Sequence, residues 1–76
     1  MMSTAGVDLM DGAFALRLRQ LRQRRGVDRK AVSECCGLSK NTVARYERGE
    51  RIPSIRQAVV LAEYYHVTLD YLCGRE

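Results

Sequence analysis

The chain has no tryptophan, one phenylalanine, one histidine and one proline among its 76 residues. With so few large aromatic side chains, we expect a thin core of short amphipathic helices rather than one that encloses a cofactor pocket. No apolar run approaches the roughly 20 residues of a membrane-spanning helix. The first residues also lack the basic and apolar regions of a signal peptide. We therefore expect one cytoplasmic domain over residues 13–74, preceded by a flexible tail over residues 1–12, with no membrane contact.

Cysteine and histidine are also sparse, and this limits the chemistry open to the chain. Three cysteines cannot all pair, and the adjacent Cys35 and Cys36 lack the C-x-x-C spacing of zinc and redox sites. We expect Cys36 to be a small core residue; a thiol or metal sensor would need a reactive Cys35 or Cys73. The single histidine, His66, is expected to cap a helix. Because no nucleophile, base and stabilising group are evident, we expect no enzyme activity, no metal, no cofactor and no small-molecule ligand.

Positive charge is concentrated in one half of the chain. Residues 13–51 hold eleven of the thirteen Lys and Arg residues and four acids, a net charge of +7, whereas the rest has a net charge of −3. Eleven of the thirteen basic residues are arginine, whose guanidinium group suits phosphate and guanine. The distribution favours a polyanionic partner over a charged face that only aids solubility.

Apolar spacing and capping residues predict five helices and no strand, over residues 13–25, 29–36, 40–48, 55–65 and 69–73. In the first helix, Phe14, Leu18 and Leu21 share one face, and most of the arginines populate the outer faces. The helix over 55–65 is expected to bury Ile55, Ala58, Leu61, Ala62 and Tyr65. The expected N-caps are Asp28, Ser39, Ser54 and Thr68.

The segment 37–49, GLSKNTVARYERG, has the most informative pattern in the chain. Gly37 ends one helix in a tight turn, and Val43 and Tyr46, three positions apart, share the inner face of the next. The side chains that then project outward are Lys40, Asn41, Thr42 and Arg45. Lys, Asn and Arg have donors and acceptors that match purine edges in the DNA major groove. The pattern therefore indicates a helix that reads a polar, anionic partner.

Further short motifs occur in order along the chain: LR at 21–22, GV at 26–27, RYERG at 45–49, PS at 53–54, LA at 61–62 and VTLDYL at 67–72. Together with a helix-turn-helix over residues 29–48, they resemble the phage-repressor (Cro-type, or XRE) helix-turn-helix family. The resemblance implies a compact all-α domain with five helices, of the lambda-repressor type. It also implies a sequence-specific double-stranded DNA-binding regulator, a repressor that acts as a homodimer and places helix 40–48 in the major groove.

The resemblance also implies roles for single residues. Base contacts are expected from Lys40, Asn41, Thr42 and Arg45. Phosphate contacts are expected from Arg29, Ser39, Arg48 and Arg51, with help from the arginines of the first helix. Arg29 replaces the glutamine usual in the family, and Arg48 and Arg51 are expected to clamp the far side of the groove together. Arg22 and Glu47 are expected to form a structural ion pair.

A protein-interaction module on the same fold, such as an antitoxin, is the alternative. Such a surface would be apolar at its centre with few charges, whereas the outer face of the helix over 40–48 is polar and basic, so DNA is favoured. For a homodimer, two surfaces stay open: the segment around Tyr71, Cys73 and Arg75, and the N-terminal tail.

Overall fold

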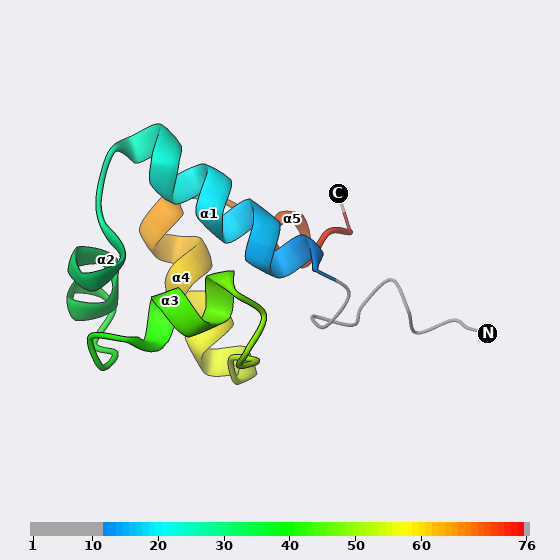
Figure 1. The fold of residues 1–76 in the computed structure, drawn as a ribbon. Coiled ribbons are helices and arrows are strands. Elements are labelled where there is room, and N and C mark those ends of the chain that lie inside the picture. Colours follow the sequence, from blue (N-terminus) through cyan, green and yellow to red (C-terminus); the bar gives the residue numbers. More distant parts are fainter. Residues whose placement is uncertain (1–11, 76) are drawn as a thin grey trace.

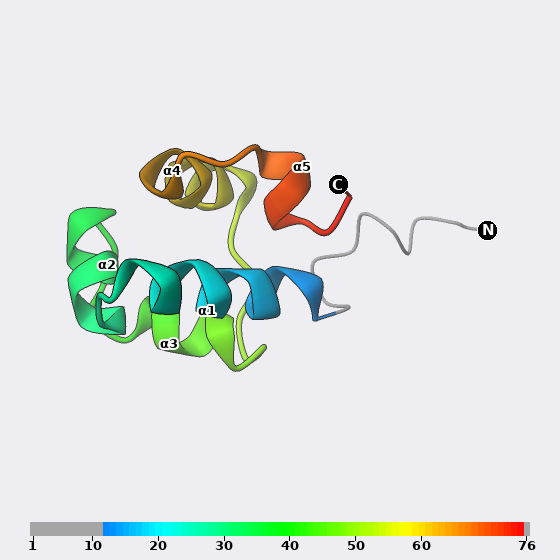
Figure 2. The ribbon, with the colours of Figure 1, turned by 90° about the horizontal axis from the view of Figure 1, so that it is seen from above.

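The computed structural model describes residues 12–75, and within that range it contains five helices and no strand. The helices are α1 (Ala13–Arg25), α2 (Arg29–Cys35), α3 (Thr42–Glu47), α4 (Ile55–Tyr65) and α5 (Leu69–Leu72). In the ribbon of Figure 1 the helices form one bundle, and Figure 2 shows α1 between α3 on one side and α4 with α5 on the other. The predicted all-α class is confirmed. The predicted tail lies outside the described residues, apart from Gly12.

A single apolar core joins the helices. Its buried members are Phe14, Leu18, Leu21, Val32, Val43, Tyr46, Ala58, Leu61, Ala62, Tyr65 and Leu72. The rings of Phe14 in α1 and Tyr46 in α3 meet edge to face with centroids 6.0 Å apart, a favoured aromatic geometry. The expectation that Ile55 is buried was wrong, because the residue is 69% exposed. Ile55 is the first residue of α4, and the first residue of this helix that is buried in the core is Ala58.

Most helix ends follow from local sequence. Asp28, Ser54 and Thr68 cap α2, α4 and α5 as predicted, and each side chain accepts a backbone N–H from the first turn. His66, at φ 58°, ends α4 in the left-handed conformation, which confirms its predicted role as a C-cap. Helices α2, α3 and α5 each end one residue earlier than predicted, because the next residue forms the C-cap.

The start of α3 differs from the prediction. Ser39 was expected to cap a helix over residues 40–48, but α3 begins at Thr42, and its N-cap is Asn41. The hydroxyl of Ser39 forms a hydrogen bond with that of Thr42 at 2.6 Å. The backbone N–H of Thr42 donates to the Ser39 carbonyl, which closes a tight turn. Lys40 and Asn41 therefore lie in the turn before α3, and the predicted cap was wrong.

None of the helices over residues 12–75 has the length and apolar character that crossing a bilayer demands. In the same range, no group of three or more His, Cys, Asp or Glu side chains is arranged to hold a metal ion.

Candidate nucleic-acid interface

The inner face of α3 is fixed to α4 through one tyrosine. Val43 and Tyr46 are buried, and the Tyr46 hydroxyl donates to the side-chain oxygen of Gln57 at 2.8 Å. The same oxygen accepts the backbone N–H of Ser54 at 3.1 Å as half of the capping box of α4. Gln57 therefore connects the inner face of α3 to the N-terminal cap of α4.

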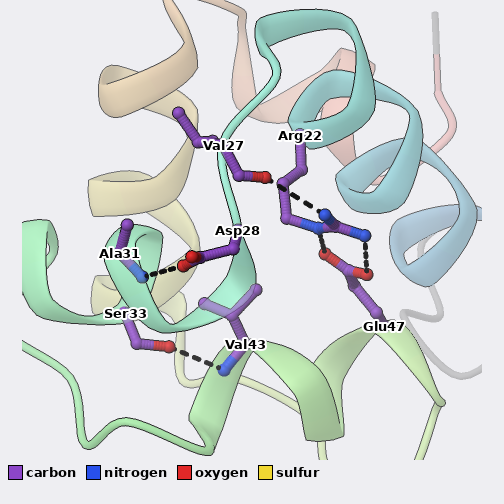
Figure 3. Close-up of polar contacts among 7 residues, drawn as sticks. All are labelled: Arg22, Val27, Asp28, Ala31, Ser33, Val43 and Glu47. Atoms are coloured by element: carbon purple, nitrogen blue, oxygen red, sulfur yellow. Dashed lines mark hydrogen bonds and ion pairs between the residues drawn. The ribbon is translucent and has the colours of Figure 1, made fainter.

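A serine in α2 fixes the start of α3. The backbone N–H of Val43 donates to the hydroxyl of Ser33 at 3.1 Å, as Figure 3 shows. Val43 is the second residue of α3, so its N–H has no acceptor within the helix. Ser33 is fully buried and supplies that acceptor from another helix. Sequence reasoning missed this residue; the available signal was a small polar side chain beside the apolar Val32.

Arg22 and Glu47, the predicted ion pair, meet between α1 and the end of α3 (Figure 3). The Nε and Nη2 atoms of Arg22 donate to the two carboxylate oxygens at 2.7 and 3.1 Å, and Nη1 donates to the Val27 carbonyl at 3.1 Å. The side chains are only 15% and 3% exposed, respectively. The hydrogen bond to Glu47 raises the pKa of the Arg22 guanidinium above its usual value. This contact ties the C-terminal end of α3 to α1.

The outer side of α3 borders a polar hollow. Its lining residues are Ser39, Asn41, Thr42, Arg45 and Arg51. The hollow thus brings together three of the four residues predicted to read bases with two of those predicted to bind phosphate. Lys40 is exposed in the turn before α3. Hydroxyl, amide and guanidinium groups in one concave surface offer several hydrogen-bond donors to an electron-rich partner. We call this surface the reading hollow.

A second hollow lies around the C-terminal end of α3 and the start of α2. Its lining residues are Arg19, Arg29, Glu47, Arg48 and Glu50. Arg48 and Arg51 were expected to act together on one side of the groove, but they line different hollows. Arg48 forms an exposed ion pair with Glu50. The hydrogen bonds that Arg48 donates lower the pKa of the Glu50 carboxyl. We call this surface the arginine hollow.

Arginines of α1 also bind tyrosines of the protein itself. The Arg17 guanidinium lies 4.3 Å from the ring centroid of Tyr71 and donates to the Tyr71 carbonyl. Arg25 lies 4.8 Å from the ring centroid of Tyr64 and donates to its carbonyl at 3.0 Å. With Arg22, three of the five arginines of α1 thus hold other helices. These three arginines therefore have a structural role, and the expected phosphate contacts of the first helix stay a prediction.

Cys35 is exposed, whereas Cys36 and Cys73 are partly buried. Cys36 packs against the core, as predicted. Burial raises the pKa of its thiol, so the less reactive protonated form prevails at neutral pH.

The fold and the site together define a helix-turn-helix domain: α2 and α3 are joined by a short turn, and α3 shows a polar side outward. A family model described as "Helix-turn-helix domain" matches residues 13–72. The chain belongs to this family.

Similar curated proteins include transcription regulators from bacteria and phage. The HTH-type transcriptional regulator AnsR of Bacillus subtilis (strain 168) is 37% identical over 60 residues, which make up 79% of this chain and 52% of AnsR. The HTH-type transcriptional regulator ImmR of the same strain is 33% identical over 60 residues, 79% of this chain and 47% of ImmR. The cryptic phage CTXphi transcriptional repressor RstR of Vibrio cholerae is 32% identical over 59 residues, 78% of this chain and 53% of RstR. The chain spans about half the length of these relatives.

A solved structure shares the fold. The crystal structure of the hypothetical transcription factor NHTF from Neisseria superposes with a TM-score of 0.80 at 20% identity, covering 96% of this chain and 83% of that chain.

Proposed function

We propose that this chain is a sequence-specific double-stranded DNA-binding regulator of transcription, a repressor that inserts α3 and the turn before it into the major groove. The names of its relatives AnsR, ImmR and RstR support this function. The observation that carries it is the two-sided character of α3. Its inner face is fixed by Gln57, Ser33 and Arg22, while its outer side borders the reading hollow.

The side chains around the reading hollow suit base edges. An asparagine such as Asn41 can bond adenine through two hydrogen bonds, and Arg45 or Lys40 can bond the O6 and N7 atoms of guanine. Thr42 can offer its methyl group to thymine. Some phosphates would contact Arg51 and Ser39, which line this hollow. Others would contact the arginine hollow on the other side. Such phosphate contacts set the position of the protein on the duplex and carry no sequence information directly.

The outer side of α3 does not fit the antitoxin-like alternative. Within residues 12–75, the large apolar side chains that are exposed lie outside α3, at Leu16, Ile52, Ile55 and Val59. A protein-binding surface centred on α3 would need such side chains there. We propose instead that α3 meets DNA, and that the protein acts in the cytoplasm without catalysis.

One module of this size covers about one half-site, so we propose a homodimer on two half-sites about 34 Å apart. Of the surfaces considered from sequence, the C-terminal one includes Tyr71, whose ring is already covered by Arg17. Sizing of the protein with and without its DNA site tests the dimer.

The function is tested by selecting binding sites from random duplex DNA. The selected duplex and a scrambled one are then titrated with the protein across a range of salt concentrations. With about four to five phosphates neutralised by exposed arginines, we expect log K to fall with log salt with a slope of about −3 to −5 per bound protein. Equal affinity for both duplexes, or an affinity that salt does not change, would contradict the proposal.

A further inference from the structure

Arg48 has a predicted role in phosphate binding, but its guanidinium is already occupied. Its Nε atom donates to Oε2 of Glu50 at 2.7 Å, and Nη2 donates to Oε1 at 3.2 Å. This is the two-pronged geometry in which arginine binds a phosphate group. The Glu50 carboxylate therefore takes the same donors that a phosphate of the DNA backbone would take.

The surroundings of the pair are rich in arginine. Arg19 and Arg29 line the same hollow as Arg48. Of the two acids in this lining, Glu47 is held by Arg22 and is almost fully buried. Glu50 is 54% exposed on its side chain, so it can turn away into water. Exposed ion pairs of this kind are weak, and an incoming phosphate can displace the carboxylate.

We propose that Glu50 competes with a DNA backbone phosphate for the Arg48 guanidinium and so lowers affinity for duplex DNA of any sequence. The inference rests on the proposed function and adds a residue that sets the level of non-specific binding. When the phosphate binds, two hydrogen bonds pass from carboxylate to phosphate oxygens, and Glu50 becomes solvated. Since every duplex has the same backbone, this competition lowers non-specific and specific affinity alike. Base contacts then decide which sites are occupied.

The test compares Glu50→Gln with Glu63→Gln on a mixed-sequence duplex of about 20 base pairs, or two helical turns. Both changes remove one negative charge, and Glu63 is exposed on α4, away from the arginine hollow. We expect Glu50→Gln to tighten binding about two- to fivefold at low salt, the range that an exposed ion pair allows. The salt slope should become steeper by at most about 0.9, the contribution of one phosphate. The gain should therefore shrink as the salt concentration rises. Glu63→Gln should change affinity less than about twofold, through the same change in net charge alone.

A second pair of variants shows whether Glu50 acts through Arg48. In an Arg48→Ala background, Glu50→Gln should give no more gain than Glu63→Gln. The proposal is overturned if Glu50→Gln matches Glu63→Gln in the native background, if it weakens binding, or if its gain persists without Arg48. Failure of the proposed function looks different, because the unmodified protein would then bind the selected and the scrambled duplex equally, or with an affinity that salt does not change. Thermal unfolding of each variant verifies that the fold is intact.

Discussion

Replacing Arg22 by alanine removes the group that neutralises Glu47, whose side chain is only 3% exposed. Two hydrogen bonds to the carboxylate and one to the Val27 carbonyl are lost with it. A buried charge left without its partner destabilises a protein by about 3–5 kcal/mol. Arg22 is itself 15% exposed, so water can reach part of the site, and we expect a loss of about 2–4 kcal/mol. For a chain of this length the whole free energy of unfolding is about 4–11 kcal/mol.

Denaturant unfolding followed by far-UV circular dichroism measures this loss. Arg24→Ala is the matched control, since Arg24 is an exposed arginine of the same helix, and its loss should stay within about 0.5 kcal/mol. Glu47→Ala should destabilise by a similar 2–4 kcal/mol. The double variant should lose less than the sum of the two, since it leaves no unpaired charge. Additive losses, or an Arg22→Ala loss no larger than that of Arg24→Ala, would refute a structural role for the pair.

Two further changes test the ends of the helices. Ser33→Ala leaves the Val43 N–H buried without its acceptor, so it should lower the free energy of unfolding by about 1–3 kcal/mol; a loss no larger than that of Ser39→Ala would show that the contact is unimportant. His66→Gly should stabilise the protein by up to about 1 kcal/mol, because φ at this C-cap is 58° and glycine adopts that conformation at no steric cost. A lower melting temperature for His66→Gly than for the unmodified protein would contradict this.

The features that sequence predicted best depend on neighbours along the chain. The bounds of α1 and α4 agree with the predicted ranges, because their ends are set by residues such as Gly26, Ser54 and His66 within a few positions. The spacing of Val43 and Tyr46 identified the inner face of α3 for the same reason. A local pattern is enough wherever the partner of a group lies within one turn.

Apart from the Arg22–Glu47 pair, which the family resemblance implied, features that depend on distant partners were missed or misplaced. The acceptor that fixes the start of α3 is the hydroxyl of Ser33, which lies ten positions before Val43 and in another helix. The local sequence instead favoured Ser39 as the N-cap. Arg17 donates to the backbone carbonyl of a tyrosine 54 positions away. The residues next to it in the sequence had instead indicated a position on the outer face of the helix. The arginine hollow gathers residues from α1, the start of α2 and the loop after α3. No spacing rule within one segment brings these residues together.

The central claim is that the outer side of α3 reads bases, and affinity ratios of two arginine variants test it most directly. Arg45 and Arg51 line the same hollow, so they form a matched pair. Arg56→Ala is the control, since Arg56 is an exposed arginine of α4 outside both hollows. Each variant is titrated on the selected duplex and on a scrambled one at two salt concentrations.

We predict that Arg45→Ala weakens binding to the selected duplex by about 1–3 kcal/mol, with much less effect on the scrambled one, and relaxes preference at one base pair. Arg51→Ala should weaken both duplexes alike and reduce the salt slope by about one. If Arg45→Ala weakens both duplexes equally, Arg45 binds phosphate and α3 does not read sequence through it. If no variant changes the affinity for either duplex, the outer side of α3 is not a DNA-binding surface.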